Sequence, residues 1–307
     1  MSEQNTRRGL LLMVLTTVIF SSQDGITKHL TGNYPVAMVV MLRFWFFGAA
    51  AVVIAVRRAG GIRAAVATRH PALQTFRGML VVVQICLSGY AFATLGLIQT
   101  HAVMVCGPLI IAALSGPILG EHVGWRRWSA IGVGGIGVLI ILRPDTTVFT
   151  PLSLLPLAAA ALWSVYVLAT RYVSRQDSST VSFLWTGLAG AAAMTVPGLW
   201  AWQPMTTGDW FWMLALCCTS VLGHFLLIKA YDLAEASALQ PLTYLQLVFI
   251  MGFGVFLYGE RLRVNVILGA AVVVAAGLFT LWRQQVRARA ARRHGGRGRQ
   301  RCWKRPC

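Results

Sequence analysis

The chain has 307 residues, of which 57% are hydrophobic and only 12% are charged, and its formal net charge is +18. A soluble domain carries about 25% charged residues, so this chain lacks the charged side chains that a water-facing surface requires. These values exclude a soluble enzyme, a disordered protein and a disulfide-rich secreted domain. They indicate an all-α polytopic membrane protein.

Ten apolar segments can cross a bilayer as helices, for which roughly 20 apolar residues are needed. In chain order they are 9–30, 35–56, 75–96, 99–119, 127–143, 151–173, 180–200, 210–231, 236–258 and 264–283. The first has the length of a signal-peptide core, but no clear A-x-A cleavage site follows it. A similar segment also begins the second half of the chain, so we expect the first one to be retained.

The distribution of Lys and Arg predicts the orientation of these segments. With ten spans both termini lie on one side, and placing them in the cytoplasm puts 22 of the 27 basic residues there. Four lie outside and Arg43 lies within a span. We therefore expect an integral protein of the bacterial inner membrane, with residues 1–8 in the cytoplasm.

Residues 284–307 form a cytoplasmic tail that is rich in arginine and has no acidic residue. A polybasic segment beside a membrane helix attracts anionic lipid headgroups. Nothing in the tail resembles a nucleic-acid recognition helix or a platform for stacked bases. The expected partner of the tail is therefore the lipid bilayer and not a nucleic acid.

The two halves of the chain resemble each other. Gly120-Glu121 closes the fourth segment and Gly259-Glu260 closes the ninth, each after a long apolar run. Each half has five spans, an odd number, so the second half must be inserted upside down. The sequence thus predicts two inverted five-helix repeats, residues 9–143 and 151–283. Secondary transporters use this plan and bind their substrate near the bilayer midplane, between the repeats.

Several short strings occur in a characteristic order along residues 9–283. They are Ser22-Gln23-Asp24-Gly25-Ile26-Thr27-Lys28, Tyr34-Pro35, Arg43, Arg171-Tyr172-Val173-Ser174-Arg175, Gly223-His224…Ala230-Tyr231, Ala236-Ser237…Pro241-Leu242…Tyr244 and Gly259-Glu260. In order and spacing they resemble EamA-type members of the drug/metabolite transporter superfamily. The resemblance implies a ten-helix secondary carrier with cytoplasmic termini. The spacing of Asp24, Lys28 and Arg43 resembles members that move S-adenosylmethionine, riboflavin or organic anions.

Asp24, Lys28 and Arg43 are ionisable groups in the first two spans, where a charge is costly and is therefore a functional candidate. Asp24 and Lys28 are four residues apart, share a helix face and can form an ion pair. In one interpretation Arg43 or Lys28 meets an anionic group of the substrate. In the other, Asp24 pairs with one of the cations and fixes the two spans together. Lys28 could also extend to the outer surface.

His101 and His224 also lie within spans, and neither has a carboxylate partner visible in the sequence. A histidine can bind and release a proton near neutral pH, so proton coupling through Asp24 or a histidine is one hypothesis. A neutral imidazole bonded to a neighbouring helix is the alternative. Glu121 and Glu260 could bind a coupling cation, but we expect each to form ion pairs with nearby arginines. These are Arg126 and Arg127 for Glu121, and Arg261 and Arg263 for Glu260.

A cavity for a small molecule needs a few polar groups among apolar walls. Together with Asp24, Lys28 and Arg43, the predicted substrate-binding residues are Gln84, Tyr90, Trp163, Tyr166, Trp185, His224 and Tyr244. Packing alone would also explain each aromatic residue. We expect Pro108, Pro117 and Pro241 to bend the fourth and ninth spans. Glycines such as Gly134, Gly135, Gly137, Gly269 and Gly277 would allow close helix contact, or would form the face of a homodimer.

No phosphate-binding loop, zinc-protease motif or serine-nucleophile motif occurs, and the chain has only nine acidic residues. No metal site or cofactor is predicted. The predicted function is secondary active transport of a small polar metabolite, an amino acid or related compound, exported by alternating access. Import of S-adenosylmethionine or riboflavin is the alternative. A membrane-embedded enzyme and a scaffold are the competing classes.

Overall fold

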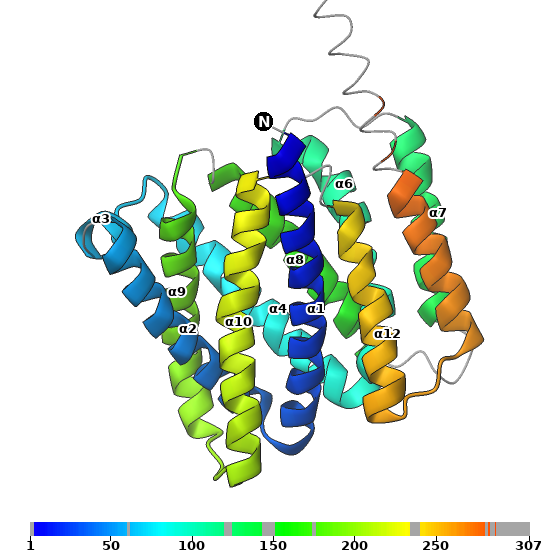
Figure 1. Cartoon of the computed structure of the whole chain (residues 1–307). Coiled ribbons are helices and arrows are strands. Elements are labelled where there is room, and N and C mark those ends of the chain that lie inside the picture. Colours follow the sequence, from blue (N-terminus) through cyan, green and yellow to red (C-terminus); the bar gives the residue numbers. More distant parts are fainter. Residues whose placement is uncertain are drawn as a thin grey trace, which may run out of the picture.

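The computed structural model describes residues 3–59, 62–119, 125–142, 151–173, 176–233 and 240–279, together with residues 282 and 286. All regular structure in these ranges is helical (Figure 1). Five of the helices are long and apolar enough to cross a membrane, and five further apolar helices are shorter. The predicted all-α polytopic fold is therefore confirmed. The predicted tail lies outside the described residues, apart from Val286.

The helices follow the ten predicted segments in order. The first half contains α1 (Glu3–Asn33), α2 (Val36–Ala59), the short α3 (Ile62–Val66), α4 (Pro71–Leu95), α5 (Leu97–Met104), α6 (Gly107–Leu119) and α7 (Trp125–Leu142). The second half contains the 3-10 helix η1 (Pro151–Leu154), α8 (Leu155–Val173), α9 (Ser179–Trp200), α10 (Thr207–Leu233), the 3-10 helix η2 (Gln240–Tyr244), α12 (Leu245–Tyr258) and a final helix, Val264–Phe279.

The fourth and ninth segments are interrupted at a proline. The fourth divides into α5 and α6, with Val105 and Cys106 in a turn just before Pro108. The ninth begins as η2, which contains Pro241, and continues as α12. Proline has no amide hydrogen and cannot continue the hydrogen-bond ladder of a helix. The bends predicted at Pro108 and Pro241 thus appear as interruptions, each in the fourth segment of its half, whereas Pro117 lies within α6.

The helices of the two halves pack in matched pairs. α1 packs on α10 and α12, and its counterpart α8 packs on α4 and α6. α4 packs on α9, and α10 packs on α2. For each of these contacts between two helices, the equivalent helices of the opposite halves are also in contact. The extensive contact of α2 with α9 joins equivalent helices. This pattern is that of two similar units related by a two-fold axis.

Glycines lie where equivalent helices meet. A Cβ added to Gly187 of α9 would lie 3.0 Å from the Cα of Gly48 in α2. A Cβ added to Gly137 of α7 would lie 2.9 Å from the carbonyl oxygen of Gly269 in the final helix. Figure 1 shows these last two helices side by side at one end of the protein. The packing role predicted for Gly137 and Gly269 is confirmed.

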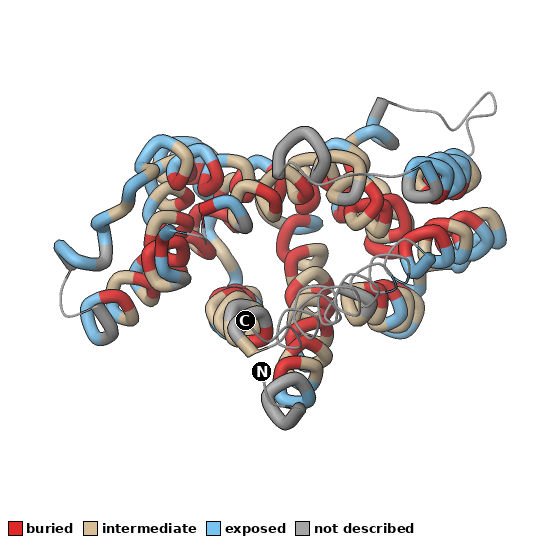
Figure 2. Tube along the Cα trace, turned by 90° about the horizontal axis from the view of Figure 1, so that it is seen from above, coloured by how far each residue is buried: buried red, intermediate tan, exposed pale blue. Residues whose placement is uncertain are grey.

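Large apolar side chains cover the outside of the helices. Phe256 is 87% exposed, Phe211 is 72% exposed and Trp200 is 92% exposed. Seen from above, buried residues lie on the helix faces that meet other helices, and exposed residues lie on the outer faces (Figure 2). Such a surface is unsuited to water but matches the hydrocarbon of a bilayer.

Candidate substrate-binding site

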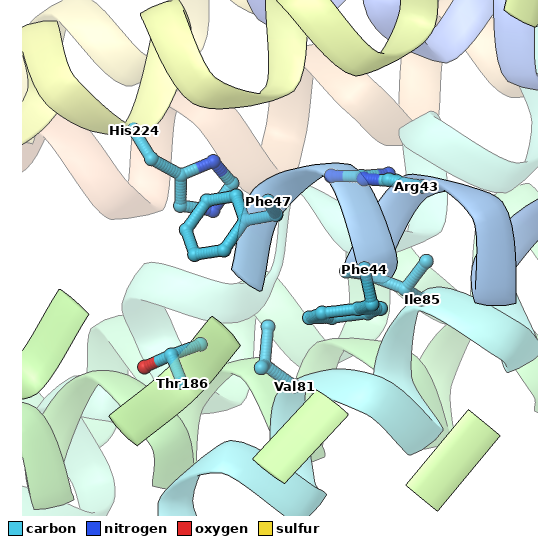
Figure 3. Close-up of a pocket in the computed structure, with 7 residues that line it drawn as sticks. All are labelled: Arg43, Phe44, Phe47, Val81, Ile85, Thr186 and His224. Carbon is cyan, nitrogen blue, oxygen red and sulfur yellow. The ribbon is translucent and has the colours of Figure 1, made fainter. Parts of the chain in front are cut away.

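A small cavity lies between the halves, among α2, α4, α9 and α10. Its lining consists of Arg43, Phe44, Phe47, Val81, Ile85, Thr186 and His224 (Figure 3). Its free space is about 10 Å³, enough for about one water molecule. Binding sites for small molecules occupy about 300–1,000 Å³. The cavity is therefore too small for a metabolite in this conformation, and a metabolite would fit only if these helices separate.

Arg43 is the cation of the cavity. It is only 6% exposed, and its guanidinium makes no hydrogen bond within the described part of the chain. An arginine side chain has five N–H donors. The carboxylate of Asp24 interacts with Arg43 electrostatically but accepts no hydrogen bond from it. The donors of Arg43 are thus available to whatever occupies the cavity.

His224 faces the same cavity from α10. Its Nδ1 lies 2.9 Å from the carbonyl oxygen of Ser220, one turn earlier in its own helix. A carbonyl oxygen can only accept, so Nδ1 carries the proton and Nε2 carries a lone pair. The ring packs between Phe20 and Phe47, with centroid distances of 5.3 and 5.4 Å. His224 is a neutral acceptor bonded to its own helix, and not to a neighbouring one.

Asp24 does not pair with Lys28, as one interpretation of the sequence expected. Its Oδ2 accepts a 3.0 Å hydrogen bond from Nε2 of Gln246 in α12. Nε2 of His101 in α5 lies 3.1 Å from the same oxygen, close enough for an ion pair but without the geometry of a hydrogen bond. Phe92 stacks on the His101 ring with a centroid distance of 5.3 Å. His101 therefore has a carboxylate neighbour that the sequence did not reveal.

Lys28 instead forms an ion pair with Glu260, which follows α12. The Glu260 carboxylate also accepts hydrogen bonds from the amides of Leu97 and Ile98, at 2.7 and 2.8 Å. These amides begin α5, where the helix dipole favours a negative charge. The Lys28 ammonium lies 4.3 Å from the centre of the Tyr258 ring. This cluster, which we call the Glu260 closure, joins α1, α5 and α12.

The predicted pairing of Glu260 with Arg261 and Arg263 is wrong. Both arginines are exposed beside it, and the carboxylate turns to Lys28 and to the α5 amides. Burial acts to raise the pKa of Glu260, but the hydrogen bonds from Lys28 and from the two amides outweigh it, so the pKa lies below its usual value. Glu121, its sequence counterpart, lies outside the described residues.

A second polar cluster lies near the opposite end of α4, around Arg77. Arg77 is one of the 22 basic residues counted on the cytoplasmic side, near the start of the third predicted segment. Its side chain lies within α4 and is 2% exposed. Its guanidinium donates hydrogen bonds to Gln74, Tyr166, Thr170, Ser182 and Thr186. Hydropathy averaged over a segment does not detect a single buried charge. This cluster joins α4, α8 and α9.

Gln74 connects Arg77 to Asp177, which lies between α8 and α9. Its Oε1 accepts from Arg77 at 2.9 Å and its Nε2 donates to Asp177 at 2.9 Å. Burial acts to raise the pKa of Asp177, but hydrogen bonds from Thr68, Gln74 and the Arg69 amide outweigh it and lower the pKa. We call Arg77, Gln74 and Asp177 with these partners the Arg77 closure.

The other predicted residues lie apart from the cavity. Gln84 donates to Ser88 within α4 at 2.8 Å. Trp163 packs beside Tyr166, with ring centroids 5.3 Å apart, and Tyr166 belongs to the Arg77 closure. Trp185 donates to the carbonyl oxygen of Val66 at 3.1 Å.

Tyr90 is 49% exposed, on the outside of α4. Tyr244 is buried, its hydroxyl has no partner within the described chain, and it faces Gly277. Of the ten predicted binding residues, the structure brings Arg43 and His224 to the cavity. Sequence reasoning missed Phe44, Phe47 and Thr186, which look like ordinary span residues.

Polar groups are buried between two five-helix halves that make equivalent contacts, and the outer surface of the helices is apolar. This arrangement is that of an integral membrane protein of the two-repeat transporter class. The sequence pattern described as "EamA-like transporter family" matches residues 7–143 and again residues 151–282. The chain belongs to this family, which confirms the resemblance and the two-repeat fold.

Curated relatives are named as transporters. A "Riboflavin transporter" of Vibrio cholerae is 28% identical over 90% of this chain and 93% of that protein. An "S-adenosylmethionine uptake transporter" of Rickettsia prowazekii is 26% identical over 90% of this chain and 93% of its own length. A "Pseudopaline exporter CntI" of Pseudomonas aeruginosa is 25% identical over 88% of this chain and 94% of that protein. One solved crystal structure shares the fold, with a TM-score of 0.61 and 18% identity over 90% of this chain and 97% of that chain.

Proposed function

We propose that this protein is a secondary active transporter that carries a small polar metabolite across the bacterial inner membrane by alternating access. The observation that carries the proposal is the cavity at Arg43 and His224, which is buried and lined from both halves. A site placed between inverted repeats is the plan by which such carriers expose a substrate to one side at a time. The names of the relatives favour transport over catalysis.

The two closures account for the alternation. The Glu260 closure joins α1, α5 and α12, and the Arg77 closure joins α4, α8 and α9. They lie near opposite ends of α4, with the cavity between them. With both termini in the cytoplasm, the Glu260 closure is the outer one and the Arg77 closure is the inner one. One closure opens while the other holds, so the cavity is never open to both sides.

There are two candidate combinations of substrate and direction of transport. Export of an amino acid or a related compound follows from the general character of the family, and one relative is named as an exporter. Import of a nucleoside-like or vitamin-like solute is the second candidate, and it is favoured by relatives named for riboflavin and for S-adenosylmethionine uptake.

Proton coupling is the proposed energy source. Asp24 and His101 are side by side in the interior, and Gln246 holds the carboxylate from the second half. A proton taken up by this pair changes the charge at a contact between α1, α5 and α12. These three elements also carry the Glu260 closure, so protonation would bias the opening of that end.

Counterflow in proteoliposomes tests the transport proposal. The purified protein is loaded with riboflavin, S-adenosylmethionine, amino acids or dicarboxylates, and exchange of the labelled compound is followed. We expect saturable exchange of one compound, recovered chemically unchanged, and loss of exchange in Arg43→Ala with folding preserved. Thr75→Ala is the matched control, because Thr75 is exposed and bonds within its own helix. Chemical conversion of the probe, or no exchange by folded protein, would contradict the proposal.

A further inference from the structure

Among the described residues, Arg43 and Arg77 are the two arginines that are more than nine-tenths buried. Arg77 shows how this protein stabilises a buried guanidinium. All three of its nitrogens donate to side-chain or backbone oxygens, and its Cζ lies 5.3 Å from the centre of the Tyr166 ring. Arg43 has no hydrogen bond in the described chain. The two residues therefore have different roles.

A mostly buried guanidinium without hydrogen bonds to the protein lowers the stability of the fold, because its donors have lost most of their contact with water and no protein acceptor replaces it. The carboxylate of Asp24 does not remove this cost. It is bound to Gln246 and lies against His101, and it makes no hydrogen bond to Arg43. Figure 3 shows the Arg43 side chain at the cavity, across from His224 and above Phe44. The missing acceptor is therefore expected to come from a ligand.

The cavity specifies the chemistry of that ligand. The planar fork of a guanidinium matches the two oxygens of a carboxylate. Nε2 of His224 offers a lone pair, which requires an O–H or N–H donor on the ligand. Phe44, Phe47, Val81 and Ile85 provide apolar walls for the remainder.

We propose that the transported substrate is a carboxylate that also carries a hydroxyl or amino donor on an apolar body, with its carboxylate bound to Arg43. This inference rests on the proposed transport function and narrows its substrate class. It also implies that Arg43 is a binding residue and not a packing residue. Arg77, which is fully partnered, provides the internal control.

Stability of the ligand-free protein tests the role of Arg43 before any substrate is known. Arg43→Met and Arg77→Met are purified in the same detergent and their thermal unfolding is compared with wild type. Arg77→Met should unfold at a clearly lower temperature, because it leaves several buried acceptors without a donor. Arg43→Met should unfold at the wild-type temperature or above it. A comparable loss in both variants would make Arg43 a structural residue and overturn the proposal.

Matched ligands test the carboxylate. The probes are 3-phenyllactate with its amide, L-tryptophan with its amide, S-adenosylmethionine, and inorganic phosphate. Concentration-dependent rises in unfolding temperature should show the acids binding about 10- to 100-fold more tightly than the amides, as a charge-assisted pair requires. The preference should vanish in Arg43→Met and return in part in Arg43→Lys. Equal binding of acid and amide, binding of phosphate alone, retention in Arg43→Met, or no response to any acid would each overturn the proposal.

Counterflow with the same probes separates this inference from the transport proposal. If neutral riboflavin is exchanged equally by wild type and Arg43→Met, the proposal of transport is supported. The proposal that the substrate is a carboxylate bound to Arg43 is then refuted. Arg43-dependent binding of an acid that is never exchanged would support the site and refute transport of that ligand class.

Discussion

Lys28 and Glu260 are 232 positions apart, and they form an ion pair that ties the first half of the protein to the second. The same carboxylate is bound to the backbone at the start of α5. The elements α1, α5 and α12 are thus held together through one side chain. The consequences can be tested by removing its charge.

Glu260→Gln should open the end of the cavity at which α5 begins. The amide keeps the shape but loses the ion pair and weakens the bonds from Leu97 and Ile98. Hydrogen exchange measured by mass spectrometry should be faster at the start of α5 in this variant. Asp209→Asn is the matched control, since Asp209 bonds to His29 and joins α1 to α10. If hydrogen exchange at the start of α5 is the same in Glu260→Gln as in wild type, Glu260 does not hold this end of the protein closed.

The Glu260 closure should also depend on pH in a defined direction. The pKa of Glu260 is lowered in the folded protein, so its contribution to stability is present above the usual carboxyl pKa of about 4.3. The contribution is lost as the pH falls through the lower folded value. The difference in unfolding temperature between wild type and Glu260→Gln should therefore be constant near neutral pH and shrink in acid. A difference in unfolding temperature that grows in acid would show that the carboxylate of Glu260 does not stabilise the folded protein in its ionised form.

Gln74→Leu should destabilise the fold by about 1–3 kcal/mol, because it leaves buried donors of Arg77 and acceptors of Asp177 without their shared partner. Thermal or denaturant unfolding in detergent measures the loss. Thr75→Ala, at the next position, should be neutral. If the two variants behave alike, Gln74 does not link the two charged residues.

His101→Gln should remove the dependence of exchange on pH, because the proposed proton site is then absent. Asp24→Asn should do the same. His70→Gln is the control, since His70 lies outside the apolar spans and bonds to Gln176. Exchange that is equally pH-dependent in His101→Gln would rule out this pair as the coupling site.

Hydropathy and proline placement predicted the helices and their interruptions, because each depends on local sequence. The partners of the charges could not be predicted in this way. The spacing of Asp24 and Lys28 correctly places them on one face of α1, yet α5 and α12 bring His101, Gln246 and Glu260 to that face. The partners of Arg77 could not be predicted for a similar reason, since acceptors of its guanidinium come from α8 and α9.

The cavity lining shows a second limit. Phe44 and Phe47 differ in no visible way from the phenylalanines that contact lipid, and only the packing of α2 against α4, α9 and α10 directs them inward. Arg43 stood out because its charge is exceptional in a span. Arg43 and His224 were therefore found from sequence, whereas Thr186 and the apolar lining of the cavity required the structure.

The glycine contacts at Gly48–Gly187 and Gly137–Gly269 join helices that occupy the same position in the two halves. Each contact is therefore self-complementary, as in an isologous dimer. A single five-helix chain that inserted into the membrane in both directions would present the same faces to its own inverted copy. The two halves of the present chain therefore contact each other as two copies of such a half-length protein would.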